Sequence, residues 1–105
     1  MTRVTQLEEF LREDPTDPFN YYALALEYLK QDVPRARQLF EHLSKAFPAY
    51  LPTYYPYTQL LIEENAEERA EEIFQQGIAM AQAHADAKTL RELRAAYNDW
   101  LFERG

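Results

Sequence analysis

The hydrophobic residues of this chain recur at intervals of three and four positions, in blocks separated mainly by aspartate and proline. This spacing places the apolar side chains of one block on one face of an α-helix. Leu39, Phe40 and Leu43 form such a face in the middle of the chain. The pattern therefore predicts an all-α protein in which each helix buries one side.

Capping residues delimit the first two predicted helices. Thr5 opens a Thr-Gln-Leu-Glu capping box and begins a short helix that ends at Asp14, because the residue before a proline avoids the α conformation. Asp17 and Pro18 are typical of the N-cap and the first residue of a helix. We expect this second helix to run to about Lys30.

The third and fourth helices also have proline near their ends. Asp32 is the expected cap of a third helix, which ends before Pro48. The fourth helix is predicted from about Thr53 to Glu64. Pro56 fits this helix only in its first turn, where backbone amides have no partner within the helix.

Two longer helices complete the chain. The fifth is predicted over about residues 66–84, and Asp86 is the expected cap of the sixth. The apolar face of the sixth helix contains Leu90, Leu93, Tyr97, Trp100 and Leu101.

The third and fifth helices repeat each other, and so do the second and fourth. At a shift of 34 residues the matching pairs are Arg35 and Arg69, Ala36 and Ala70, Leu39 and Ile73, and Phe40 and Phe74. At a shift of 33 residues they are Tyr21 and Tyr54, Tyr22 and Tyr55, Leu24 and Tyr57, Ala25 and Thr58, and Tyr28 and Leu61. The two shifts differ by one residue. This difference falls in the turn before Pro34, where a deletion is easily accommodated.

This repeat resembles the tetratricopeptide repeat (TPR) family, whose helix–turn–helix unit has a period of about 34 residues. Small residues occupy the family's close-approach positions at Ala25, Ala36, Thr58 and Ala70, whereas Leu43 stands at a position that is usually small. The resemblance implies antiparallel helix pairs in a right-handed superhelix. There would be about two repeats, with a short N-terminal helix and a C-terminal capping helix.

The expected organisation is a single TPR-like domain over residues 1–105. It consists of an N-terminal helix (5–14), a first repeat (17–48), a second repeat (51–84) and a capping helix (86–104). The capping helix has Arg94 at its small position, and a bulky charge there indicates that no further helix packs on that face.

The resemblance also implies a binding surface, because in this family the first helices of the pairs line a concave face that holds partner peptides. The corresponding residues here are Tyr22, Leu26, Leu29, Lys30, Tyr55, Gln59, Ile62 and Glu63, joined by Lys88, Arg91 and Ala95 of the capping helix. Tyrosine is enriched at protein interfaces. The alternative is that Tyr22 and Tyr55 are half-buried packing residues, since aromatic residues at helical spacing usually belong to the core.

Composition narrows the classes of partner. The formal net charge of −7 disfavours nucleic acid and anionic membrane surfaces, which leaves protein or peptide partners. No apolar run is long enough to span a bilayer, and the N-terminal segment lacks the apolar region of a secretory signal. The chain has no cysteine, which suits a reducing compartment, and we predict a cytoplasmic location.

Residue patterns for catalysis or metal binding are missing. Neither His42 nor His84 has an acidic residue three positions earlier, and the glutamates between residues 63 and 72 fit a solvated helix face. Ser44 lies in no Gly-x-Ser-x-Gly motif, and the chain has no glycine-rich phosphate loop. We therefore predict a non-enzymatic protein that needs no metal or cofactor.

Two functional hypotheses follow from the sequence. The first is a protein-binding adaptor or scaffold that holds a peptide or protein partner in the concave groove. The alternative is a self-associating structural subunit, such as a homodimer, which buries an apolar flank formed by Trp100, Leu101 and Phe102.

Overall fold

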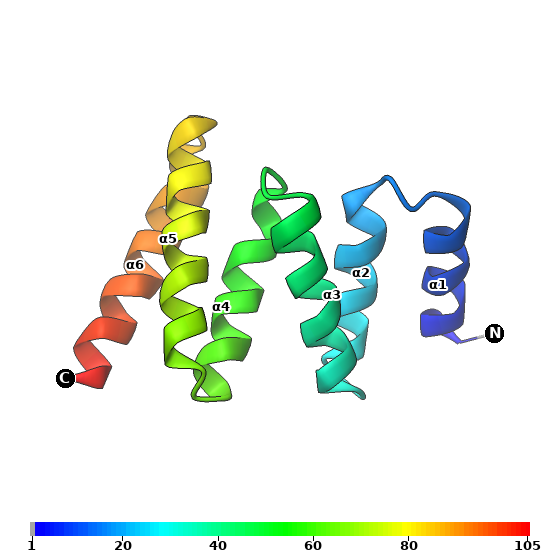
Figure 1. Cartoon of the computed structure of the whole chain (residues 1–105), viewed down its shortest axis with the longest axis horizontal. Helices are drawn as coiled ribbons and strands as arrows, with labels where there is room; N and C mark the ends of the chain where they lie inside the picture. Colours follow the sequence, from blue (N-terminus) through cyan, green and yellow to red (C-terminus); the bar gives the residue numbers. More distant parts are fainter. Residues whose placement is uncertain (1) are drawn as a thin grey trace. The chain divides into compact units, whose positions relative to one another are not determined.

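The computed structural model describes residues 2–105, which form six α-helices and one short 3-10 helix (Figure 1). The chain divides into two compact units, Met1–Thr53 and Tyr54–Gly105, and each is described by itself. Adjacent helices within a unit run in opposite directions (Figure 1). The prediction of an all-α fold of antiparallel helix pairs is confirmed, whereas a single domain over residues 1–105 stays a prediction.

The first unit contains helices α1 (Arg3–Glu13), α2 (Pro18–Tyr28) and α3 (Val33–Ala46), followed by the 3-10 helix η1 (Leu51–Thr53). The carboxylate of Asp17 accepts a hydrogen bond from the Phe19 amide at the start of α2, as expected for an N-cap. Asp32 caps α3 in the same way by accepting from the amide of Arg35. Both predicted caps are therefore present.

The start of α1 differs from the prediction. Its N-cap is Thr2, whose hydroxyl oxygen accepts a hydrogen bond from the Thr5 amide, so the helix begins two residues before Thr5. Glu8 makes no capping bond and instead accepts a hydrogen bond from the Tyr28 hydroxyl on α2. The capping-box prediction was wrong because Thr2 provides an equally good cap and Glu8 has a tertiary partner.

The core of the first unit lies where α2 meets α1 and α3. Ala25 and Ala36 are fully buried at the small positions, so the backbones of a helix pair can approach closely. The ring of Tyr21 lies 4.6 Å from that of His42 and 5.7 Å from that of Phe47, measured between centroids. Its hydroxyl donates to the carbonyl of Pro15, which ties α2 to the preceding turn.

The second unit contains α4 (Tyr54–Glu63), α5 (Glu67–Ala83) and α6 (Ala87–Arg104). Pro56 lies in the first turn of α4, and Asp86 caps α6 by accepting from the Thr89 amide, both as predicted. Asn65 and Ala85 follow the ends of α4 and α5 with positive φ angles of 58° and 54°. This left-handed conformation ends each helix and directs the chain into the next one.

Helices α4 and α5 lie close together at Gly77. A Cβ atom placed on Gly77 would lie 2.7 Å from Cγ of Tyr54, which shows that the tyrosine ring lies directly on the glycine backbone. The Tyr54 hydroxyl accepts a hydrogen bond from the Gln76 side chain at 2.9 Å. Tyr54 is fully buried as a result, and α4 is held in one rotational setting against α5.

Helix α6 also packs on α5, through aromatic residues. The ring of Trp100 stacks on that of Phe74 at 5.5 Å, and the Arg104 guanidinium covers the indole at 4.5 Å from its centroid. Trp100 is only 5% exposed, so the sequence interpretation of Trp100 as part of an open apolar flank was wrong. The aromatic contacts across α5 account for its burial.

Candidate protein-binding groove

A surface hollow of about 470 Å³ lies between the first and last helices of the second unit. Tyr55 of α4 forms one side of it, and Glu92, Ala95, Ala96 and Asp99 of α6 form the other. The small alanine side chains leave space beside the tyrosine ring. An open surface of this kind suits a chain segment better than a small molecule, which usually binds in an enclosed cavity.

A second, smaller hollow of about 190 Å³ shares residues with the first. It is lined by Tyr55, Gln59, Ile62, Ala96, Asp99, Trp100 and Glu103. We refer to the two hollows together as the α4–α6 groove. Tyr55, Ala96 and Asp99 line both hollows, so they mark the middle of the groove.

The orientation of α4 explains why Tyr55 faces outward. Its neighbours Tyr54 and Tyr57 are buried, and the Thr58 hydroxyl donates to the carbonyl of Tyr55 at 2.9 Å. The side of the helix that bears Tyr55, Gln59 and Ile62 is therefore turned away from the core. Tyr55 keeps 49% of its surface exposed, a large area for an aromatic side chain.

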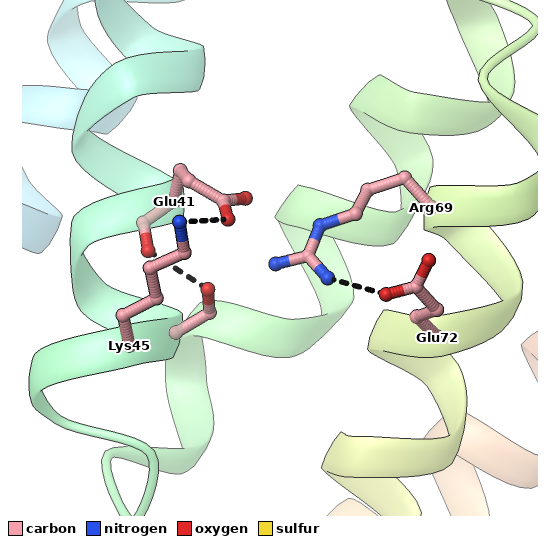
Figure 2. Close-up of polar contacts among 5 residues, drawn as sticks. Glu41, Lys45, Arg69 and Glu72 are labelled. Atoms are coloured by element: carbon pink, nitrogen blue, oxygen red, sulfur yellow. Dashed lines mark hydrogen bonds and ion pairs between the residues drawn. The ribbon is translucent and has the colours of Figure 1, made fainter.

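The α6 side of the groove is acidic. Glu92, Asp99 and Glu103 line it, and no hydrogen bond or ion pair involves their carboxylates within residues 2–105. Two acidic residues on second helices of the pairs are different, because Glu41 pairs with Lys45 on α3 and Glu72 pairs with Arg69 on α5 (Figure 2). The groove thus has carboxylates available to a ligand.

Four of the residues predicted from the sequence line the α4–α6 groove, namely Tyr55, Gln59, Ile62 and Ala95. Glu63, Lys88 and Arg91 are exposed but line neither hollow. Lys88 lies one turn before Glu92 on α6, towards the end of the groove. Arg91 lies one residue before Glu92, and one residue corresponds to about 100° of rotation around the helix axis.

The other predicted residues belong to the first unit. Tyr22 and Leu26 lie on α2, and Leu29 and Lys30 directly follow its last residue, Tyr28. Tyr22 is half-buried, with its ring edge-on to that of Tyr50 at 5.7 Å, and burial raises the pKa of Tyr22. Lys30 is exposed and pairs with Glu27 at 3.4 Å. Tyr22 therefore has a packing role that the exposed Tyr55 does not share.

Sequence reasoning missed Glu92, Ala96, Asp99 and Glu103. Their spacing of three, four and seven residues places them on one face of α6, next to the buried positions Leu93 and Trp100. Counting outward from these two apolar positions would have found the face. The family's register gives Lys88, Arg91 and Ala95 instead, and of these only Ala95 lines the groove.

The described residues show no arrangement for metal chemistry. Between residues 2 and 105, no group of three or more His, Cys, Asp or Glu side chains is placed to hold a metal ion. The carboxylates of the groove follow one another along α6 and do not converge. Within the same part of the chain, no helix has the length and apolar character needed to cross a membrane.

A fold made only of short antiparallel helices, with an open groove beside the first helix of a pair, defines a helix-pair repeat protein. Residues 2–87 match the family model "Suppressor of forked protein (Suf)". A comparison with curated proteins gives no match.

Two solved structures are similar to this chain over most of its length. The solution NMR structure of a tetratricopeptide repeat domain protein from Salinibacter ruber is 40% identical, with a TM-score of 0.77, and the match covers 83% of this chain and 89% of that chain. A crystal structure of a tetratricopeptide repeat domain protein from the same organism is 39% identical, with a TM-score of 0.74. This match covers 80% of this chain and 96% of that chain. The chain therefore belongs to the tetratricopeptide repeat family. This fold generally mediates interactions between proteins and is typically non-catalytic.

Proposed function

We propose that this chain is a non-catalytic adaptor that holds a peptide or protein segment in the α4–α6 groove. The face formed by Tyr22, Leu26, Leu29 and Lys30 is a second contact surface for the same class of partner. We expect the adaptor to act in the cytoplasm, in line with a chain that has no cysteine.

The observation that supports this proposal is the exposure of Tyr55 inside the hollow. An aromatic ring with 49% of its surface exposed, beside the small side chains of Ala95 and Ala96, offers an anchor point for an apolar side chain of a partner. Aromatic anchors in a concave surface contribute much of the binding energy at protein interfaces.

Selection from a phage-displayed library of 12-residue random peptides tests the proposal. Peptides enriched on the wild-type protein are then measured against Tyr55→Ala. We expect binding to weaken by at least tenfold while the melting temperature stays nearly unchanged, because Tyr55 packs little against the core.

The matched control is Phe102→Ala, which also removes an exposed ring. Phe102 is 88% exposed and lines neither hollow, so this variant should bind the selected peptides like the wild type. Equal binding by Tyr55→Ala and the wild type would place the contact surface outside the α4–α6 groove and refute the proposal.

Self-association is the second candidate function, and exposed apolar residues near the C-terminus favour it. Phe102 and Leu101 keep 88% and 37% of their surfaces exposed. A second copy of the chain would cover them, whereas Trp100 is already buried within its own unit.

A further inference from the structure

We propose that the α4–α6 groove selects a basic segment, in which lysine or arginine side chains flank an apolar residue. The inference rests on the proposed function of the groove and specifies the chemistry of its partner. The apolar residue would lie on Tyr55 and Ala96, and the cations would face the carboxylates of α6.

The charges that line the groove favour a basic segment. Every ionisable side chain of α6 in the two hollows is acidic, namely Glu92, Asp99 and Glu103. Arg104 is directed elsewhere, because it covers Trp100 and pairs with Glu67 of α5 at 3.2 Å. The other cations of α6 line neither hollow, namely Lys88, Arg91 and Arg94. An acidic partner would therefore meet uncompensated repulsion in the groove, whereas a basic partner would meet open carboxylates.

The groove's carboxylates also have no partner that a basic ligand would need to displace. Glu67 and Glu72 on α5 already form ion pairs with arginines of the same unit. Glu92, Asp99 and Glu103 form none within residues 2–105. Binding of a cation at these three positions therefore adds an interaction without breaking one.

The spacing of the carboxylates along α6 predicts the spacing of the basic residues in the bound segment. At 1.5 Å of rise per residue, Asp99 and Glu103 are separated by about 6 Å along α6, and Glu92 and Glu103 by about 16 Å. An extended peptide advances about 3.3 Å per residue, so these separations correspond to about two and five residues. The expected motif has three basic residues. The one that faces Glu103 lies two positions from the one that faces Asp99 and five positions from the one that faces Glu92, with an apolar residue between the basic ones.

The remaining uncharged side chains of the groove fit such a segment. Gln59 and Ile62 follow Tyr55 along α4 and line the smaller hollow, where an amide and an aliphatic surface lie side by side. The Gln59 side chain can donate to or accept from the backbone of an extended chain. Polar contact to the backbone and apolar contact to a side chain together would hold the segment in one register.

The library selection described above also tests this inference, with two measurements added. The first is the composition of the peptides whose binding depends on Tyr55. The second is their affinity for the triple variant Glu92→Gln, Asp99→Asn and Glu103→Gln. We expect the selected peptides to be rich in lysine and arginine, and the variant to bind them about tenfold more weakly, a loss of about 1.4 kcal/mol.

A second triple variant, Glu9→Gln, Glu13→Gln and Glu68→Gln, is the control for net charge. These glutamates line neither hollow, and the substitutions remove the same three charges. Its affinity should stay within about twofold of the wild type, because charges that do not line the groove would act on a bound segment only through solvent, where salt screens them. A tenfold loss with this variant as well would show a general charge effect and overturn the inference.

The outcomes separate the two proposals. If the selected peptides depend on Tyr55 but are neutral or acidic, or bind the groove variant as well as the wild type, basic selectivity is refuted and the groove proposal stands. If no enriched peptide depends on Tyr55, the groove proposal fails and the inference fails with it. Selected peptides that are basic, Tyr55-dependent and weakened only by the groove variant support both.

Discussion

The ring of Tyr54 lies directly on the backbone of Gly77, so a Cβ atom on residue 77 would not fit between α4 and α5. Tyr54 is completely buried there and receives a hydrogen bond from Gln76. In the first unit, the fully buried Leu43 stands at the position that corresponds to Gly77. Tyr21 packs instead on His42 and Phe47 and remains partly exposed.

Replacement of Gly77 by alanine should destabilise the protein. Alanine normally stabilises a helix interior relative to glycine by about 1 kcal/mol. Here the added methyl group would come within 2.7 Å of the Tyr54 ring, and overpacking of this kind costs about 1–3 kcal/mol. Urea unfolding of Gly77→Ala measures the change.

The double variant Gly77→Ala with Tyr54→Leu tests the cause of that loss. If the clash is responsible, the effects of the two substitutions will be strongly non-additive, because the leucine side chain leaves space for the methyl group. Additive effects, or a stabilised single variant, would show that the contact is less tight than the structure indicates.

Ala85→Gly should stabilise the second unit. Ala85 adopts a φ angle of 54°, and its successor Asp86 donates from its amide to the Ala81 carbonyl across the end of α5. This conformation is unfavourable by about 1–2 kcal/mol for a residue with a side chain, and glycine avoids most of that cost. We expect a gain of about 1 kcal/mol in the free energy of unfolding.

The same substitution at Ala79 is the matched control. Ala79 is also exposed but lies within α5, where glycine should cost about 1 kcal/mol. Effects of opposite sign at the two positions are expected in thermal or urea unfolding. A loss at both positions would contradict the left-handed turn at Ala85.

Stability should decrease at alkaline pH because tyrosines are held in their neutral form. Burial raises the pKa of Tyr54 above its usual 10.0, and the hydrogen bond that Tyr97 donates to Glu71 raises the pKa of Tyr97. Because their pKa values are raised in the folded state, the contribution of these two tyrosines to stability is complete below about pH 10. It is lost as the pH rises through their folded-state pKa values.

Urea unfolding between pH 8 and about pH 12 measures this decline in the wild type and in Tyr54→Phe. At neutral pH the variant should lose about 1 kcal/mol with the Gln76 hydrogen bond. Above about pH 10 it should lose stability less steeply than the wild type, because one buried phenol can no longer ionise. Parallel curves would contradict a raised pKa at Tyr54.

Light scattering on a sizing column should find a monomer of 12.5 kDa across a range of protein concentrations. Leu101 and Phe102 form a small apolar surface, and a stable interface usually buries about 1,200 Å² or more in total. If a dimer appears, Phe102→Asp decides whether these residues hold it together. Dissociation by that variant would favour the self-association hypothesis over the adaptor.

The sequence determined the helices and their pairing, because the signals involved are local. Asp17, Asp32 and Asp86 cap helices through side chains that reach only two or three residues along the chain. The repeat then relates the helix pairs to each other, and the resemblance assigned Tyr55, Gln59 and Ile62 to one face. These features do not depend on contacts between residues far apart in the sequence.

The tertiary structure alone decided how α6 is rotated and what it buries. One residue of helical register corresponds to about 100° around the axis, so a small error moves a side chain from the groove to its edge. The packing of Trp100 on Phe74 and the bond between Tyr97 and Glu71 set that rotation. These contacts join residues 26 positions apart, and they turn Glu92, Asp99 and Glu103 towards the groove in place of Arg91.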